Sequence, residues 1–123
     1  MTREEASRFA GDWADAWNAR DVERVLSHFA DEVTFTSPTA LAVAGTGTVR
    51  GKEALRNYWN AALSRVDSLR FTVDRVVWDP GTRELAIIYA SAINGRTRRV
   101  SENLIFGPDG LVVRADVFHG VEA

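Results

Sequence analysis

Glu102 is the side chain whose type and position first suggest chemistry. It lies two residues from the apolar Val100 and two from Leu104, in a segment, 96–106, that alternates polar and apolar residues. The alternation predicts a strand with Glu102 in the middle of its apolar face. Burial opposes ionisation of a carboxyl, so the pKa of Glu102 should rise unless the group is paired. Such an acid suits general acid–base catalysis or service as a neutral donor; the alternative is a plain pair with Arg98 or a helix amide.

His119 falls on the same predicted face, at the end of the last strand and near Arg98 and Ser91. A histidine there is expected to act as a general base, a second proton carrier or a substrate contact. The alternative is an ordinary solvated histidine. For His28, late in a short helix, we expect a solvated position or an interaction with the helix dipole.

Four aromatic residues recur at helical spacing, and they divide into two interpretations. Trp17 and Trp59 are expected to pack in the core, whereas Trp13 and Tyr58 are expected to line a cavity, each offering one polar hydrogen to a ligand. The full set of ligand-binding candidates is Trp13, Ser37, Tyr58, Tyr89 and Arg98.

Three arginines follow the turn of a predicted hairpin closely: Arg96, Arg98 and Arg99. Successive strand residues face opposite sides of a sheet, so the run does not form one patch. We expect these arginines to be solvated at the hairpin tip; the alternative is that they contact an anionic group of a ligand.

Several kinds of site are excluded. The loop 45–53 has five residues between Gly45 and Gly51, and Glu53 stands where a phosphate-binding loop needs Ser or Thr. Ser37 has no evident His/Asp pair, so a serine triad is unsupported. The chain has no cysteine and two histidines, so thiolate sites are excluded, and we expect neither a metal nor a cofactor. A net charge of -2 argues against binding to nucleic acid or an anionic membrane.

The length of 123 residues predicts a single domain, 1–123. A capping box at Thr2 and Glu5 begins a helix that breaks at residues 18–20. Asp21 caps a shorter helix, expected to direct Val22, Val25, Leu26 and Phe29 inward. A strand over 33–37, a loop over 38–50 and a third helix over 51–66 follow.

Four strands are predicted in the second half: 69–79, 84–93, 96–106 and 111–119. Asn94-Gly95 is a strong signal for a two-residue hairpin loop, which places Glu102 opposite Ile87. A four-residue loop after residue 106 would place Arg98 opposite His119 and Glu102 opposite Ala115. The apolar face then carries Leu85, Ile87, Tyr89, Val100, Leu104, Phe106, Val113, Ala115 and Val117, with Glu102 among them. Segregated helices and antiparallel strands indicate an α+β fold.

Three segments resemble the NTF2-like superfamily, in its branch of small bacterial SnoaL-like and ketosteroid-isomerase-like proteins. They are Trp17-Asn18-Ala19-Arg20-Asp21, Phe29-Ala30-Asp31-Glu32-Val33-Thr34-Phe35-Thr36-Ser37-Pro38 and Arg50-Gly51-Lys52-Glu53-Ala54-Leu55-Arg56-Asn57-Tyr58-Trp59. Residues 106–110 and 112–118 fit that family's last hairpin. The resemblance implies a cone: three N-terminal helices packed on a curved, mainly antiparallel sheet that encloses a pocket, often in a dimer formed through the outer sheet face.

The resemblance also implies roles for individual residues. In the steroid isomerases an Asp base faces a Tyr and a protonated Asp. Trp13 matches the position of the Tyr, Ser37 that of the base and Glu102 that of the protonated acid. Tyr58 and His119 match pocket positions. Because Ser37 stands at the base position, the resemblance argues against steroid isomerisation by that mechanism.

The residues and the resemblance together suggest two alternative functions. The first is a cofactor-independent isomerase, cyclase, dehydratase or hydrolase for a small hydrophobic substrate, with Glu102 and His119 as catalytic residues. The second is a non-catalytic domain that binds a small ligand or serves as a dimeric interaction unit. A homodimer is expected, because the apolar Ala86, Ile88, Ala90 and Phe118 lie on the uncovered sheet face. A cytoplasmic location is expected, because the sequence shows neither a signal peptide nor an apolar run long enough to span a membrane.

Overall fold

The computed structural model describes residues 1–122, which form four helices and six strands. The helices are α1 (Arg3–Asn18), α2 (Val22–Leu26), α3 (Pro38–Ala44) and α4 (Lys52–Leu63). The strands are β1 (Phe29–Thr36), β2 (Thr48–Arg50), β3 (Leu69–Asp79), β4 (Glu84–Ile93), β5 (Arg96–Phe106) and β6 (Val112–Glu122). The expected α+β class is confirmed.

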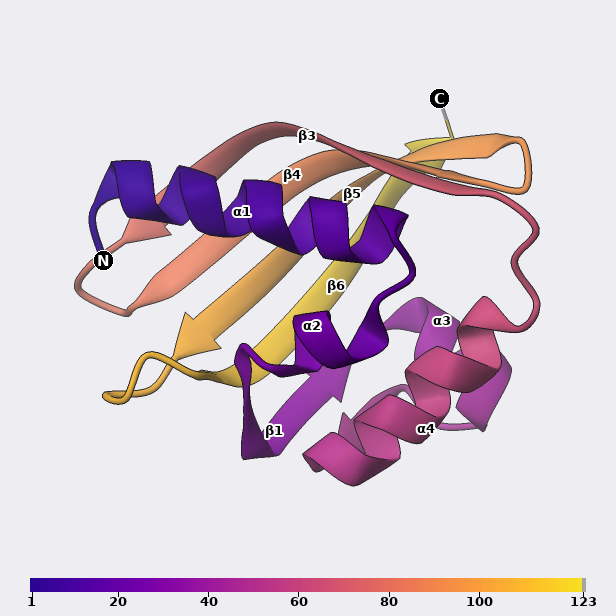
Figure 1. Ribbon diagram of the computed structural model, residues 1–123, viewed down its shortest axis with the longest axis horizontal. Coiled ribbons are helices and arrows are strands. Elements are labelled where there is room, and N and C mark those ends of the chain that lie inside the picture. The colour runs from indigo at the N-terminus through magenta and orange to yellow at the C-terminus, as the bar shows by residue number, and fades with distance from the viewer. Residues whose placement is uncertain (123) are drawn as a thin grey trace.

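The strands form one curved sheet in the order β2-β1-β6-β5-β4-β3. Every neighbouring pair is antiparallel except β1 with β6, which run parallel. Helix α1 lies across one face of this sheet, and α3 and α4 lie together beyond its end (Figure 1). Among residues 1–122 no helix packs on the opposite face, so the sheet has a covered inner side and an uncovered outer side.

Two tight connections hold the end of α1 and the hairpin tip in place. Asn18 closes α1 onto β3, because its amide Nδ2 donates to the Phe71 carbonyl at 3.0 Å and its Oδ1 accepts from the Phe71 N–H at 2.7 Å. Asn94 has a left-handed φ of 51°, and its Oδ1 accepts from the backbone N–H groups of Asp67 and Ser68. These bonds position α1, β3 and the β4–β5 turn around the same space.

The prediction of a loop over 38–50 is wrong. Ser37 accepts a hydrogen bond from the Thr39 N–H and caps α3, Pro38 occupies the first turn, and Gly45 ends the helix with a φ of 78°. These are the ordinary start and stop signals of a helix, and Thr48–Arg50 then pairs with β1 as β2. The described chain therefore has four helices where three were expected.

The predicted register is confirmed for one hairpin and wrong for the next. Ile93 pairs with Arg96 and Ile87 with Glu102, as a two-residue loop requires. In the β5–β6 pair Glu102 lies opposite Val117, two residues from the expected Ala115. The loop between these strands is one residue longer than expected, and a register shift beside Phe106 adds a second residue. Because side chains alternate between faces along a strand, a register shift of two residues leaves each side chain on its expected face. At the irregularity next to Phe106 the shift is one residue, and there Val112 is buried in place of the expected Val113.

Candidate functional site

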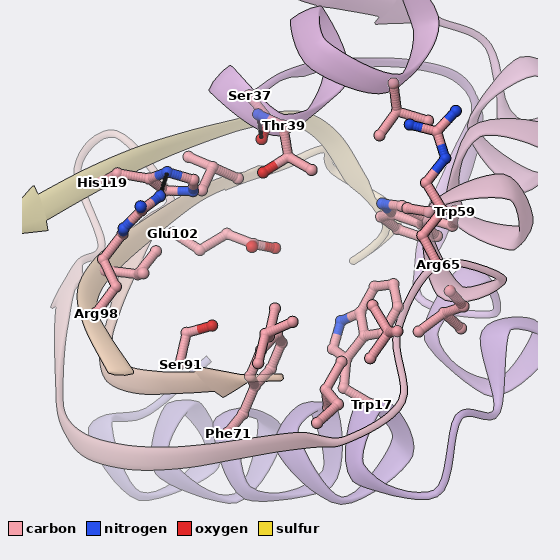
Figure 2. Close-up of a pocket in the computed structure, with 18 of the residues that line it drawn as sticks. Trp17, Ser37, Thr39, Trp59, Arg65, Phe71, Ser91, Arg98, Glu102 and His119 are labelled. Carbon is pink, nitrogen blue, oxygen red and sulfur yellow. Dashed lines mark hydrogen bonds between the residues drawn. The ribbon is translucent and has the colours of Figure 1, made fainter. Parts of the chain in front are cut away.

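A cavity of about 430 Å³ opens between the inner sheet face, the end of α1, and helices α3 and α4. Its volume lies in the range of small-molecule sites. Most of its wall is apolar or aromatic: Trp17, Phe35, Val43, Trp59, Ala62, Leu63, Val66, Leu69, Phe71, Ile93, Val100 and Val117. Its polar wall consists of Ser37, Thr39, Tyr58, Arg65, Tyr89, Ser91, Asn94, Arg96, Arg98, Glu102, His119 and Glu122. Figure 2 shows Glu102 extending from β5 into this space.

Glu102 is buried among apolar neighbours, with only 5% of its surface exposed. Its cross-strand partners are Ile87 on β4 and Val117 on β6. Burial raises the pKa of the Glu102 carboxyl to about 8, against the smaller opposing effects of the Trp13 N–H and the Tyr89 hydroxyl. A carboxyl with a pKa of about 8 is mainly protonated at pH 7.

The pair between Glu102 and Arg98, the alternative left by the sequence, is not formed. Among residues 1–122 the structure places no cation within ion-pair distance of Glu102. The buried Trp13 Nε1 faces Glu102 but does not reach hydrogen-bond geometry with any described acceptor. The neutral form of Glu102 therefore has a proton available for a molecule in the cavity.

Arg98 and His119 form the second polar group of the cavity (Figure 2). The Nη1 of Arg98 and the Nδ1 of His119 are 2.9 Å apart. A guanidinium can only donate, so Nδ1 must accept and the proton of the neutral ring must reside on Nε2. Burial, and then the charge of Arg98, lower the pKa of His119, which agrees with a neutral imidazole. In this arrangement His119 offers an N–H, and its lone pair is already used.

The two tyrosines of the cavity are neutral donors. Burial raises the pKa of Tyr58, on α4, to about 12. Burial, and then the charge of Glu102, raise the pKa of Tyr89 well above its ordinary value. Ser37 is 4% exposed, and its hydroxyl accepts from the Thr39 N–H at 3.2 Å as the cap of α3. Ser37 thus has a structural task at the position where the resemblance implies a base.

The structure brings most of the predicted site residues together. Six of them line the cavity: Ser37, Tyr58, Tyr89, Arg98, Glu102 and His119. Trp13 does not, because it is fully buried behind the wall, with ring centroids 5.5 Å from Phe71 and 4.9 Å from Tyr89.

Trp17 and Trp59 pack in the core as expected, and they also line the cavity. Their rings meet edge to face with centroids 4.9 Å apart. Helix α1 crosses the sheet, and only its last turn reaches the cavity, so Trp17 is exposed to the cavity while Trp13, one turn earlier, is covered. The sequence interpretation also missed Thr39, Arg65 and Asn94; of these, Asn94 had a signal, its place in the Asn-Gly turn.

Two other classes of site have no counterpart within residues 1–122. No helix there has the length and apolar character needed to cross a membrane. No group of three or more His, Asp or Glu side chains there is arranged to hold a metal ion.

Comparison with known structures identifies three informative relatives. A SnoaL-like protein of unknown function from Burkholderia thailandensis shares 36% sequence identity, with 98% of each chain covered and a TM-score of 0.88. A candidate ketosteroid isomerase from Kribbella flavida is 19% identical over 97% of this chain and 80% of its own, with a TM-score of 0.74. The epoxide hydrolase/cyclase-like enzyme SalBIII, which acts in pyran ring formation in the polyether salinomycin, is 15% identical, with a TM-score of 0.75 over 96% of this chain and 92% of its own.

Similarity to the last two structures establishes the fold alone. Other structures with this fold are NTF2-like proteins, which confirms the expected NTF2-like architecture. Comparison with functionally curated proteins found no match. The model of the SnoaL-like domain matches residues 10–117, which is most of the chain, and the chain therefore belongs to the SnoaL-like family.

Proposed function

We propose that this protein is a cofactor-independent acid–base enzyme that acts on a small, largely apolar molecule held in the cavity. The observation that carries the proposal is Glu102, a buried carboxyl with a pKa of about 8 that faces a cavity of about 430 Å³. Buried acids with raised pKa values in a cavity are typical of catalytic sites. An ordinary packing role would not leave such a group open to a ligand.

The arrangement supports protonation of a substrate oxygen. Protonated Glu102 can give its proton to a carbonyl, an epoxide or a departing hydroxyl group. The carboxylate left behind would face the Tyr89 hydroxyl and the Trp13 N–H, both of which favour its ionised form. Proton transfer back from the product or water restores the acid. Isomerisation, cyclisation, dehydration and hydrolysis all contain such a step.

The remaining polar groups favour acid chemistry over abstraction of a proton from carbon. Ser37 caps α3, and the Nδ1 lone pair of His119 accepts from Arg98, so neither is placed as a strong base. His119 would contact substrate as a donor through Nε2. The SnoaL-like family, and the shared fold of an epoxide hydrolase/cyclase-like enzyme, agree with ring-forming or ring-opening reactions.

The test begins with a thermal-shift screen against epoxides, polyketide-like aromatics, steroids and fatty acids. A ligand at one hundred times its Kd should stabilise the protein by about 2.7 kcal/mol. Turnover of each hit is then followed by mass spectrometry for the wild type, Glu102→Gln and the exposed Glu32→Gln. Glu102→Gln should lower kcat by about 10²–10⁴-fold, and Glu32→Gln should not change it. Binding without turnover in the wild type, or full turnover in Glu102→Gln, would contradict the proposal.

We also propose that the protein is a homodimer formed through the outer sheet face. That face carries partly exposed Ala86, Ile88 and Ala90, and Phe118 is 59% exposed. Burial of this patch against a second copy would remove apolar surface from water. Light scattering at micromolar concentration should give twice the chain mass, and Phe118→Glu should give the monomer. A monomeric wild type would contradict this proposal.

A further inference from the structure

The cavity has a charge opposite to that of the whole chain. The chain carries a net charge of -2, yet Arg65, Arg96 and Arg98 all line the cavity. Among residues 1–122 two acids line it, and one of them, Glu102, is largely protonated at neutral pH. The other is Glu122, at the rim. Cations concentrated on the wall of an apolar cavity favour anionic ligands.

Arg98 is the cation best placed to bind such a ligand. It is partly buried, and among residues 1–122 it forms no salt bridge with a carboxylate. Glu122, its register partner on β6, is directed instead to Arg96, with a separation of 3.5 Å. On the outer face of the same strand, Arg99 lies 3.6 Å from Asp74, so the adjacent arginine has an acidic partner. Partial burial of a cation without a counter-ion carries a desolvation cost, and a ligand carboxylate would lower that cost.

Arg98 and its bonded partner His119 both offer hydrogen-bond donors to the cavity. Nη1 of Arg98 is engaged by His119, and the other guanidinium N–H groups remain available for bonding. His119 presents its Nε2–H, because its Nδ1 accepts from Arg98. A planar, singly charged carboxylate matches a guanidinium in shape and charge, and it costs less to desolvate than a dianion.

Resting on the proposed acid–base function, we propose that the substrate is an amphipathic organic acid whose carboxylate binds to Arg98 and His119. Its apolar body would lie against Trp17, Trp59 and Phe71, and its reacting oxygen would reach Glu102. His119 lies opposite Val100, which is roughly 7 Å from Glu102 along β5, so one small molecule would contact both groups. The arginine run at the hairpin tip thus contributes one member, Arg98, to the recognition of an anion.

The test uses naphthyl-alkanoic acids with one to four methylene groups, together with their methyl esters, as probes. Isothermal titration at pH 7 measures the Kd of each probe for the wild type, Arg98→Gln, Arg98→Lys, Arg99→Gln and Glu102→Gln. The wild type should bind at least one acid about tenfold or more tightly than its ester. Arg98→Gln should remove that preference. Arg98→Lys should retain part of it, since lysine keeps the positive charge but lacks the two parallel N–H donors of a guanidinium. Arg99→Gln removes the same charge from the outer face and should leave the preference intact.

The variants separate failure of this proposal from failure of the proposed function. Glu102→Gln should keep the preference for the acid while it loses turnover, because it retains Arg98. Equal binding of acid and ester in the wild type would overturn the proposal, as would an unchanged preference in a folded Arg98→Gln variant. Failure of every acid to bind below about 1 mM would also overturn it. None of these results depends on whether Glu102 is catalytic.

Discussion

Replacement of Glu102 by Gln should change how the stability of this protein depends on pH. Gln has the shape of a protonated Glu but cannot ionise. The folded-state pKa of Glu102 is about 8, whereas an unfolded Glu titrates near 4.3. Between these values the folded protein binds more protons than the unfolded chain. The stabilisation is therefore full below about pH 4 and is lost as the pH rises through about 8.

The size of the effect follows from these two pKa values. Each unit of difference is worth about 1.36 kcal/mol, and most of the interval lies between pH 5 and pH 9. The wild type should lose about 4 kcal/mol of unfolding free energy relative to Glu102→Gln over this range. Burial lowers the pKa values of His28 and His119, so their effect has the opposite sign, stability being lost as the pH falls. Both histidines are present in both proteins, and the difference between the proteins removes their contribution.

Urea unfolding followed by tryptophan fluorescence, at one-unit intervals from pH 5 to pH 9, would measure this difference. The exposed Glu32→Gln controls for the loss of a surface charge. The stability of Glu102→Gln relative to wild type should grow from pH 5 to about pH 8 and then level off, and that of Glu32→Gln should not change in this way. Parallel stability profiles for wild type and Glu102→Gln would refute the reasoning, since they would mean that Glu102 ionises as easily in the folded protein as in water.

Three further substitutions test the framework around the cavity. Asn94→Ala removes an amide that accepts two backbone hydrogen bonds at a left-handed φ, so it should cost about 2 kcal/mol in urea unfolding. Leu85→Ala removes a fully buried side chain from the inner sheet face and should cost about 2–5 kcal/mol in the same assay. Thr2→Ala removes the capping box of α1, with an expected cost of about 1 kcal/mol, and the melting temperature should fall accordingly. An unchanged midpoint for any one of them would contradict the role given to that residue.

The sequence was most informative where local chemistry determines geometry. The Asn-Gly turn admits a two-residue loop, so the β4–β5 register, and with it the position of Glu102 opposite Ile87, could be predicted. The β5–β6 loop is longer and is followed by a register shift, neither of which has a distinct sequence signal. For this reason the predicted partner of Glu102 on β6 was wrong by two residues, although Glu102 was assigned to the correct face of the sheet.

The position of the central acid, Glu102, could be predicted from the sequence, whereas the residues that form the cavity wall were predicted less well. Alternation along β5 places Glu102 on the buried face whatever the neighbouring strand does. Helical spacing identifies the inner face of α1 but not which turn reaches a cavity. Trp13 was therefore wrongly expected to line the cavity, while Trp17 packs in the core as expected and also lines the cavity. The sequence predicted His119 opposite Arg98, but the structure pairs His119 with Val100 and Arg98 with Glu122. The two side chains still meet at 2.9 Å, because both are long enough to bridge this difference in register.

The proposed function requires Glu102 to be a protonated acid facing the cavity at neutral pH. Its most direct test is a titration of the side-chain carboxyl carbons of glutamate by ¹³C NMR, with the Glu102 signal assigned by its loss in Glu102→Gln. We predict a midpoint near pH 8 for this signal. A midpoint below pH 5 would show an ionised carboxylate at neutral pH and would contradict the account.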